Sequence, residues 1–246
     1  MKPRIEIFTN TAELARAAAH SFLAHSRDAE SKRGNFTVAL SGGSTPKSLY
    51  KLLADPNEEF RDQLLWDRTH FFWTDERHVG PDHPDSNYRM ANEAMLAHVP
   101  VPNVNVHRMP GERTNAEEAA LDYESEIVTF FAKDGLPRFD LILLGLGTDG
   151  HTASIFPGSE VLQEKRRLIA APWVDKLNSY RLTMTLPLLN NAATIAFLVS
   201  GTEKAEILRE VLQGAPSRFP AQEIKPTNGE LNWLVDSAAA EKLVDL

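Results

Sequence analysis

Four short polar segments of this sequence carry residue types suited to anion binding and proton transfer: 41–46, 74–85, 145–151 and 201–204. Each follows an apolar run of the length of a buried strand. Together they supply glycines, hydroxyls, guanidinium and ammonium groups, carboxylates and imidazoles. Such a set suits a small anionic substrate bound beside a group that can exchange protons near neutral pH.

Segment 41–46 (SGGSTP) joins a predicted strand to a predicted helix. Gly42 and Gly43 would let backbone N–H groups approach an anion, and Ser44 and Thr45 would donate hydroxyl hydrogens beside the positive helix end. The spacing is not that of a Walker A loop, so ATP is not implied. The alternative is a simple strand-to-helix turn capped by Thr45.

Lys204 and Arg181 are the cations that could join such an anion site. The sequence predicts a helix over 203–213, with Lys204 in the first turn, where the helix dipole disfavours a cation unless an anion is bound. Arg181 immediately precedes an uncharged stretch, 182–202, and its guanidinium could grip the same anion. The alternatives are a solvated lysine and a structural ion pair.

Segment 145–151 (GLGTDGH) matches the dinucleotide fingerprint G-x-G-x-x-G by letter. A dinucleotide site is disfavoured because Pro157 and Gly158 interrupt any helix that would follow. A glycine-rich turn presenting Asp149 and His151 fits better. The alternative is a hydrogen-bonded turn aspartate beside a surface histidine.

Segment 73–78 (WTDERH) ends another predicted strand, and we expect Asp75 and Arg77 to face the site. His83 and nearby aspartates suggest a metal, but the spacing is not His-Glu-x-x-His and turn residues explain much of the composition. We therefore expect no metal. No G-x-S-x-G nucleophile motif occurs, so a hydrolase built from this chain would use water as its nucleophile.

Composition excludes several classes of protein. The 246 residues are 42% hydrophobic and 24% charged, which is ordinary for a globular chain. Zero cysteines exclude disulfides, thiolate zinc sites and a cysteine nucleophile. The formal net charge of −8 argues against a nucleic-acid partner.

We expect neither a signal peptide nor a membrane span, and therefore a cytoplasmic protein. No apolar run precedes Glu6. The uncharged stretch 182–202 contains Pro187, Asn190 and Asn191. Placing these polar residues in a bilayer core would cost free energy, so the stretch is predicted to lie in the protein interior.

Apolar runs alternate with amphipathic segments along the whole chain. Strands are predicted at 4–8, 36–40, 70–74, 139–144, 168–171, 194–200 and 231–235. Helices are predicted from the Asn10 cap to about 29, from Pro46 toward 53, and over 86–97, 114–131 and 203–213. This order predicts one α/β domain over 1–246, a mostly parallel, Rossmann-like sheet with helices on both faces. The polar segments should then meet beyond the carboxyl ends of the strands.

The polar segments, in this order, resemble the 6-phosphogluconolactonase family. The resemblance spans essentially the whole chain and is carried by 41–46 (SGGSTP), 73–77 (WTDER), 85–88 (DSNY), 144–157 (LGLGTDGHTASIFP), Arg181, 201–204 and 231–233 (LNW). It implies the NagB/RpiA-like version of the α/β fold. It also implies hydrolysis of 6-phospho-D-glucono-1,5-lactone to 6-phosphogluconate in the pentose phosphate pathway, without a cofactor.

The same resemblance implies roles for individual residues. His151 would be the general base that activates water, and either Asp149 or Asp75 would orient its ring. Arg77 would bind the oxyanion or the emerging carboxylate. The phosphate would be held by Gly42, Gly43, Ser44, Thr45, Arg181 and Lys204.

Two other functions remain open at this point. The related glucosamine-6-phosphate deaminases carry a glutamate where this chain has Phe156, and Asp-Glu-Tyr where it has Asp75-Glu76-Arg77. Both differences favour the lactonase. A non-catalytic sugar-phosphate sensor would need only the phosphate loop. Monomer and homodimer are equally compatible with the sequence.

Overall fold

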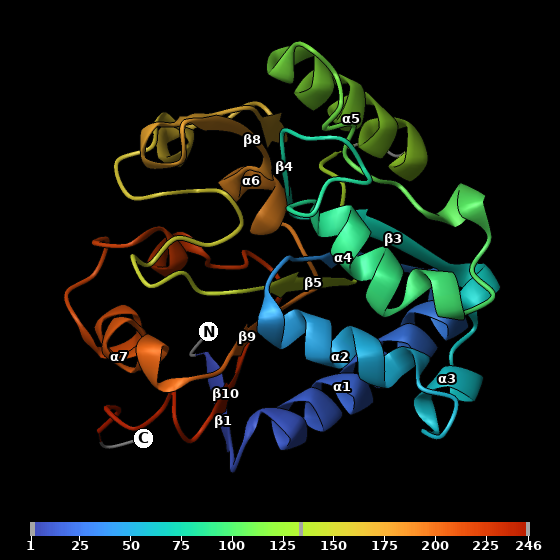
Figure 1. The fold of residues 1–246 in the computed structure, drawn as a ribbon, viewed down its shortest axis with the longest axis horizontal. Helices are drawn as coiled ribbons and strands as arrows, with labels where there is room; N and C mark the ends of the chain where they lie inside the picture. The colour runs from blue at the N-terminus through green and yellow to red at the C-terminus, as the bar shows by residue number, and fades with distance from the viewer. Residues whose placement is uncertain (1–2, 133–134, 245–246) are drawn as a thin grey trace.

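A computed structural model of the protein describes residues 3–132 and 135–244. Its main sheet contains β1 (Arg4–Phe8), β2 (Phe36–Leu40), β3 (Thr69–Trp73), β5 (Leu141–Leu144), β9 (Thr194–Val199) and β10 (Glu230–Asp236). All neighbouring strands are parallel, in the order β1-β10-β9-β5-β2-β3 (Figure 1). The predicted fold class is confirmed. The strand predictions at 4–8 and 36–40 match to the residue.

A second, smaller sheet was not anticipated from the sequence. It consists of β4 (Asp75–Arg77), β8 (Ser179–Met184) and β6 (Ile169–Ala170), and β7 (Trp173–Val174) pairs with β8. All of its pairings are antiparallel. Three of its four strands are only two or three residues long, too short to show an alternation in the sequence. Of these, only β6 had been predicted, and as a longer strand.

Helices cover both faces of the main sheet. The helices are α1 (Thr11–Arg33), α2 (Ser44–Ala54), α3 (Phe60–Gln63), α4 (Asn87–Ala94), α5 (Ala116–Phe131), α6 (Leu186–Leu189) and α7 (Ala205–Gln213). Successive side chains of a strand point to opposite faces. Phe72 of β3 packs on Phe130 of α5 at 5.2 Å between ring centroids, whereas Trp73 packs on Tyr88 of α4 at 5.4 Å.

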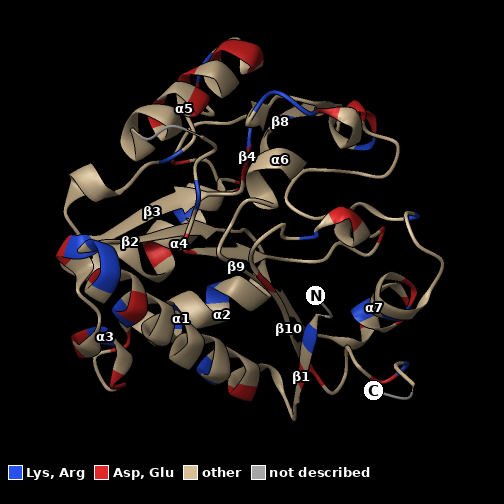
Figure 2. Ribbon diagram, turned by 180° about the vertical axis from the view of Figure 1, so that it is seen from behind, with Lys and Arg blue, Asp and Glu red and all other residues tan. Residues whose placement is uncertain are grey.

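The pictures show the same layering. In Figure 1, α1 and α2 lie side by side, and α5 lies apart from them beside β8. Figure 2 shows charged residues mainly on helices and loops, with some on β1 and β10, while the central strands β2, β5 and β9 carry none. In the described part of the chain, no helix is long and apolar enough to cross a membrane.

Local sequence sets the helix ends. Asn10 accepts a hydrogen bond from the backbone N–H of Glu13 at 3.0 Å, as its predicted cap role requires, and Asn115 caps α5. The prediction that α1 ends near residue 29 is wrong. The helix continues to Arg33 because Gly34, at φ 82°, supplies the left-handed residue that terminates it.

The strand order creates a switch point between β2 and β5. The chain leaves β2 through α2 toward β3 on one side, and leaves β5 through the second sheet toward β9 on the other. Connections that diverge in this way open a crevice beyond the carboxyl ends of the two strands. The loops 41–46 and 145–151 border that crevice.

A histidine pair lies at the contact between β3 and α5, away from the crevice. His70 Nδ1 lies 3.2 Å from His107 Nε2, and His107 Nδ1 lies 2.8 Å from Glu126 Oε1. The His70 ring also packs against Phe130 at 4.7 Å. Burial, and then the charge of His107, lower the pKa of His70 from 6.5 to about 4.

This depressed pKa predicts a pH-dependent stability. Between pH 6.5 and about 4 the unfolded chain binds a proton that folded His70 does not, so the free energy of unfolding falls as pH falls through that window. We expect His70→Gln, which cannot titrate, to lose less stability over the same interval. Urea denaturation at several pH values measures both slopes, and equal slopes would contradict the prediction.

Candidate active site

The crevice holds a cavity of about 220 Å³. It is bordered by the loops that follow β2, β5 and β9, together with β4. Eight of the residues singled out from the sequence line it: Gly42, Gly43, Ser44, Thr45, Asp75, Arg77, His151 and Lys204. Asp149 and Arg181, the other two, do not line it, but Asp149 contacts His151 and Arg181 lies opposite Arg77 in a strand pairing. The convergence of four polar segments beyond the strand ends is therefore observed.

The loop 41–46 is fixed by Tyr50 of α2. The buried Tyr50 hydroxyl accepts from the backbone N–H of Ser41 at 3.1 Å and donates to its carbonyl at 2.9 Å. Gly43, at φ 108°, occupies the cap position of α2, which has no side-chain cap. The first N–H groups of α2 are thus free of a side-chain acceptor, as an anion site requires. The alternative of a Thr45 cap is wrong.

Thr45 instead links two of the loops. Its Oγ1 lies 2.8 Å from Oγ of Ser200, which follows β9. Ser41 Oγ is buried and has no hydrogen-bond partner among the described residues. Hydroxyls from both loops therefore line the same end of the cavity.

Asn87 is a lining residue that the sequence analysis did not assign to the site. Its Nδ2 donates to the Asp75 carbonyl at 2.9 Å, and a Cβ on Gly42 would lie 2.1 Å from its Oδ1. Only glycine therefore fits at position 42 while Asn87 stays in place. The signal available in the sequence was the segment DSNY at 85–88.

Glu76 fixes the helix that carries Asn87. Its buried carboxylate accepts from the backbone N–H groups of Asn87 at 2.7 Å and Tyr88 at 2.8 Å, and from Ser86 Oγ at 2.9 Å. Burial raises the pKa of Glu76, and these hydrogen bonds oppose the rise. A carboxylate at the start of α4 also complements the helix dipole.

His151 is held by Asp149. The distance from Asp149 Oδ1 to His151 Nδ1 is 2.5 Å, and Asp149 Oδ2 accepts from the ammonium group of Lys176. Burial alone would raise the pKa of Asp149, but the bonds from Lys176 and His151 outweigh it and lower the pKa to about 2. Nε2 of His151 has no hydrogen-bond partner in the described part of the chain.

The turn 145–151 fits closely around this ring. A Cβ on Gly147 would lie 2.0 Å from His151 Nδ1, so the ring occupies the space that a side chain would need. The backbone closes the turn, with Gly147 N donating to His151 O at 2.9 Å. No helix opens at Gly150, in keeping with the expectation that this loop is not a dinucleotide fingerprint.

Asp75 has different partners. Its Oδ2 accepts from Ser154 Oγ at 2.7 Å and its Oδ1 from Thr74 Oγ1 at 3.3 Å. Of the two aspartates considered from the sequence, the one in contact with His151 is thus Asp149. Ser154, which lies in a turn, therefore bonds a cavity-lining carboxylate.

Arg77 and Arg181 lie opposite each other in the pairing of β4 with β8. Arg77 donates to the carbonyl of Asp85 at 2.8 Å, and Arg181 to that of Tyr180 at 3.0 Å. Burial and the neighbouring charge of Arg77 lower the pKa of Arg181. Two adjacent guanidiniums bonded to carbonyls rather than carboxylates favour an anion between or beside them. Arg181 thus lies beside Arg77, although it is not among the residues that line the cavity.

Lys204 lines the cavity from the loop after β9. It ends a 3-10 turn over Thr202–Lys204, and α7 begins at the next residue. The expectation that Lys204 lies inside the first α-helical turn is therefore wrong. Gly201, at φ 99°, donates its N–H to Asp236 Oδ1 at 3.1 Å and sets the direction of this turn.

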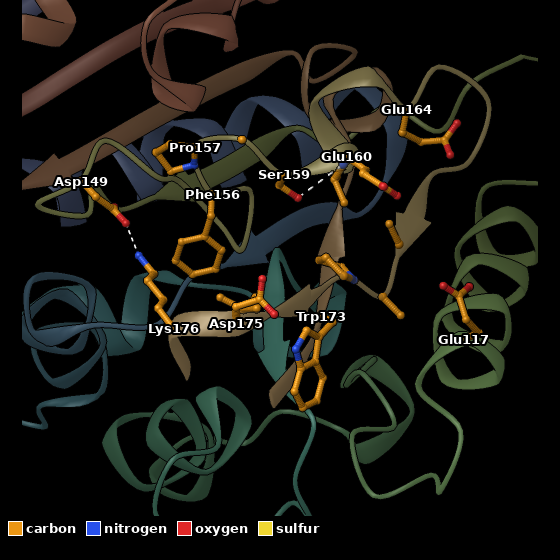
Figure 3. Close-up of a pocket in the computed structure, with 16 residues that line it drawn as sticks. Glu117, Asp149, Phe156, Pro157, Ser159, Glu160, Glu164, Trp173, Asp175 and Lys176 are labelled. Carbon is orange, nitrogen blue, oxygen red and sulfur yellow. Dashed lines mark hydrogen bonds and ion pairs between the residues drawn. The ribbon is translucent and has the colours of Figure 1, made fainter. Parts of the chain in front are cut away.

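A larger groove of about 840 Å³ lies behind the Asp149 side chain (Figure 3). Four carboxylates besides Asp149 line it: Glu117, Glu160, Glu164 and Asp175. Despite its size it is a poor anion site, because these charges would repel one, and His151 lines the smaller cavity instead. Among residues 3–132 and 135–244, no three His, Cys, Asp or Glu side chains are grouped to hold a metal.

The fold and the site together define a class of protein. It is an α/β protein with a parallel main sheet, whose switch-point crevice holds an aspartate–histidine pair beside the glycine-rich loop 41–46 and Lys204. The chain belongs to the glucosamine-6-phosphate isomerase/6-phosphogluconolactonase family, whose sequence profile matches residues 9–233.

Individual relatives agree with this assignment. The chain is 44% identical to a 6-phosphogluconolactonase from Synechocystis, over 99% of both chains, and 41% identical to one from Nostoc, again over 99% of both. Among solved structures, a 6-phosphogluconolactonase from Trypanosoma cruzi superposes with a TM-score of 0.87 at 29% identity, covering 99% of this chain and 98% of that one. A monomeric glucosamine-6-phosphate deaminase, at 21% identity, covers 98% of this chain and all of its own with a TM-score of 0.82, which supports the fold alone.

Substitution of Tyr50 tests how the loop 41–46 is held in place. Tyr50→Phe leaves the N–H and carbonyl of Ser41 without their partner in a buried place, so we expect the free energy of unfolding to fall by about 1–3 kcal/mol. Urea denaturation measures the loss. Tyr180→Phe, at a side chain that is 40% exposed, is the matched control and should change little. Equal effects of the two substitutions would contradict the role given to Tyr50.

Proposed function

We propose that this protein hydrolyses 6-phospho-D-glucono-1,5-lactone to 6-phosphogluconate, the lactonase step of the oxidative pentose phosphate pathway. The observation that carries the proposal is the Asp149–His151 pair beside the cavity that also contains the 41–46 loop and Lys204. The names of the relatives at 44% and 41% identity support the same reaction.

His151 acts as the general base. Asp149 accepts a hydrogen bond from the Nδ1–H group of His151. The lone pair of Nε2 is therefore available to take a proton from water. The water oxygen attacks the lactone carbonyl carbon, and its proton passes to Nε2. A lactone carbonyl is already electrophilic, so one positioned base and one anion stabiliser suffice.

Arg77 stabilises the charge that forms on the carbonyl oxygen. Its guanidinium lines the cavity and makes its side-chain hydrogen bond to a backbone carbonyl, so it keeps donors for an oxyanion. When the tetrahedral intermediate collapses, the bond from carbon to ring oxygen breaks, and the ring oxygen takes the proton from His151. The carboxylic acid that forms then loses its remaining proton to solvent. Arg77 is then placed to hold the new carboxylate. Asp75 orients the sugar by accepting hydrogen bonds from the hydroxyl groups of the sugar.

The phosphate binds at the other end of the cavity. Gly42 and Gly43 contribute backbone N–H groups, Ser44 and Thr45 contribute N–H and hydroxyl groups, and Lys204 contributes charge. Arg181, beside Arg77, adds positive potential near the cavity. These cations act locally against a formal net charge of −8.

Phe156 argues against deaminase chemistry at this site. Its ring lies 4.4 Å from that of His151, at the position where the deaminase branch carries a glutamate. A phenyl group cannot take up or release a proton. Ammonia release from glucosamine 6-phosphate tests this alternative directly, and saturable phosphosugar binding without lactone hydrolysis would instead indicate a sensor.

Removal of the base tests the mechanism. We expect His151→Ala to lower kcat by about 10²–10⁴-fold while KM changes little, because the imidazole acts on water rather than on the phosphate. The assay follows lactone consumption with the uncatalysed rate subtracted. The exposed His98, outside the cavity, gives the control variant His98→Ala. Undiminished turnover by His151→Ala would refute the assignment.

Substitution of Lys204, the lysine at the proposed phosphate site, should change KM rather than kcat. We expect Lys204→Ala to raise KM by about tenfold or more with kcat nearly unchanged, since a charged contact to phosphate is present in both the ground and the transition state. Lys225→Ala, at an exposed lysine paired with Glu223, is the matched control. A loss confined to kcat would mean that Lys204 contacts the reacting centre.

A further inference from the structure

Lys176 is the cation on the far side of the carboxylate that holds His151. It lies in the 3-10 turn Asp175–Leu177, between β7 and β8. Its Nζ donates to Asp149 Oδ2, while the other oxygen of Asp149 meets His151 Nδ1 (Figure 3 shows the first contact). The three side chains thus form a chain from ammonium to carboxylate to imidazole.

Phe156 completes the cluster. Lys176 Nζ lies 4.3 Å from the centroid of the Phe156 ring, and the same ring lies 4.4 Å from that of His151. An ammonium over an aromatic face gains a cation–π attraction. Lys176 is therefore held in place by two independent contacts, although its side chain is 51% exposed.

Lys176 does not line the cavity that contains His151. It lines the larger groove on the other side of Asp149, as Figure 3 shows, and that groove is acidic. Its position therefore favours an action through Asp149 over a contact with an anionic substrate.

The charges suggest what that action is. A lone carboxylate beside an imidazole favours the protonated ring, which cannot accept a proton from water. An ammonium on the second carboxylate oxygen offsets part of that effect and fixes the carboxylate plane. The other charged groups near His151 are Arg77, Asp75 and Lys204, which line its cavity.

We propose that Lys176 is a positioning residue for the hydrolysis, which holds Asp149 so that the His151 ring is correctly oriented. The inference rests on the proposed function, because it assigns Lys176 to the base of that reaction. It extends the site from the loop after β5 to the β7–β8 hairpin, whose second strand also carries Arg181.

The test compares Lys176→Met and Lys176→Arg in the full chain, with Lys32→Met as control at an exposed lysine paired with Asp28. We expect Lys176→Met to lower kcat about tenfold with KM within about twofold, and to move the acid limb of kcat/KM upward by about half a pH unit. Lys176→Arg keeps the charge and should retain the acid limb and most of kcat.

A second measurement does not depend on turnover. NMR titration of the His151 ring should show its midpoint moving upward in Lys176→Met and remaining in place in Lys176→Arg. An unmoved midpoint in Lys176→Met would overturn the inference, whether or not the protein is a lactonase. Failure of the wild-type protein to hydrolyse the lactone would instead overturn the proposed function.

Two other outcomes would also overturn the inference. A rise in KM at unchanged kcat in Lys176→Met would mean that Lys176 binds the substrate directly. Equal losses in Lys176→Met and Lys176→Arg, together with lowered melting temperatures, would mean that the lysine only stabilises the β7–β8 turn.

Discussion

Parallel pairing of β2 with β5 is the constraint on which the site depends. The register sets Val38 opposite Leu141 and Ala39 opposite Ile142, so both strands end at the same edge of the sheet. The loop after β2 supplies the anion cradle, and the loop after β5 supplies the aspartate–histidine pair. Because the chain diverges from these two strands in opposite directions, a crevice lies beyond their carboxyl ends. An anion held by the loop after β2, as proposed above, would therefore lie beside the imidazole of the loop after β5.

The second sheet contributes the remaining charges. Antiparallel pairing of β4 with β8 sets Arg77 opposite Arg181, and the hairpin of β7 with β8 brings Lys176 to Asp149. The protein as a whole is acidic, with a formal net charge of −8. The proposed binding of an anion would thus depend on Arg77, Arg181 and Lys204, which the fold brings near the cavity from separate segments. The main sheet sets the positions of the loop 41–46 and of His151. The smaller sheet sets the positions of the charged groups Arg77, Arg181 and Lys176.

Close packing explains why certain residue types stand where they do. Gly42 leaves room for Asn87, and Gly147 leaves room for the ring of His151. Both glycines are required by the approach of a polar side chain from elsewhere in the site. The buried carboxylate of Glu76 similarly bonds the start of α4, which ties the helix that carries Asn87 to β4. The small cavity is consequently built from side chains and backbone that constrain one another.

The sequence by itself determined the parallel α/β class, the strands Arg4–Phe8 and Phe36–Leu40, the Asn10 cap and the convergence of the four polar segments. These follow from hydrophobic periodicity and capping, which act over a few neighbouring residues. Only the tertiary structure decided which aspartate holds His151 and that Lys176, Asn87 and Ser154 belong to the site. Asp149 and His151 are only two positions apart, but Lys176 lies 27 positions after Asp149, and Ser154 lies 79 positions after Asp75. Contacts over such separations are set by strand register and by the second sheet, whose shortest strands are too brief to leave a periodic signal.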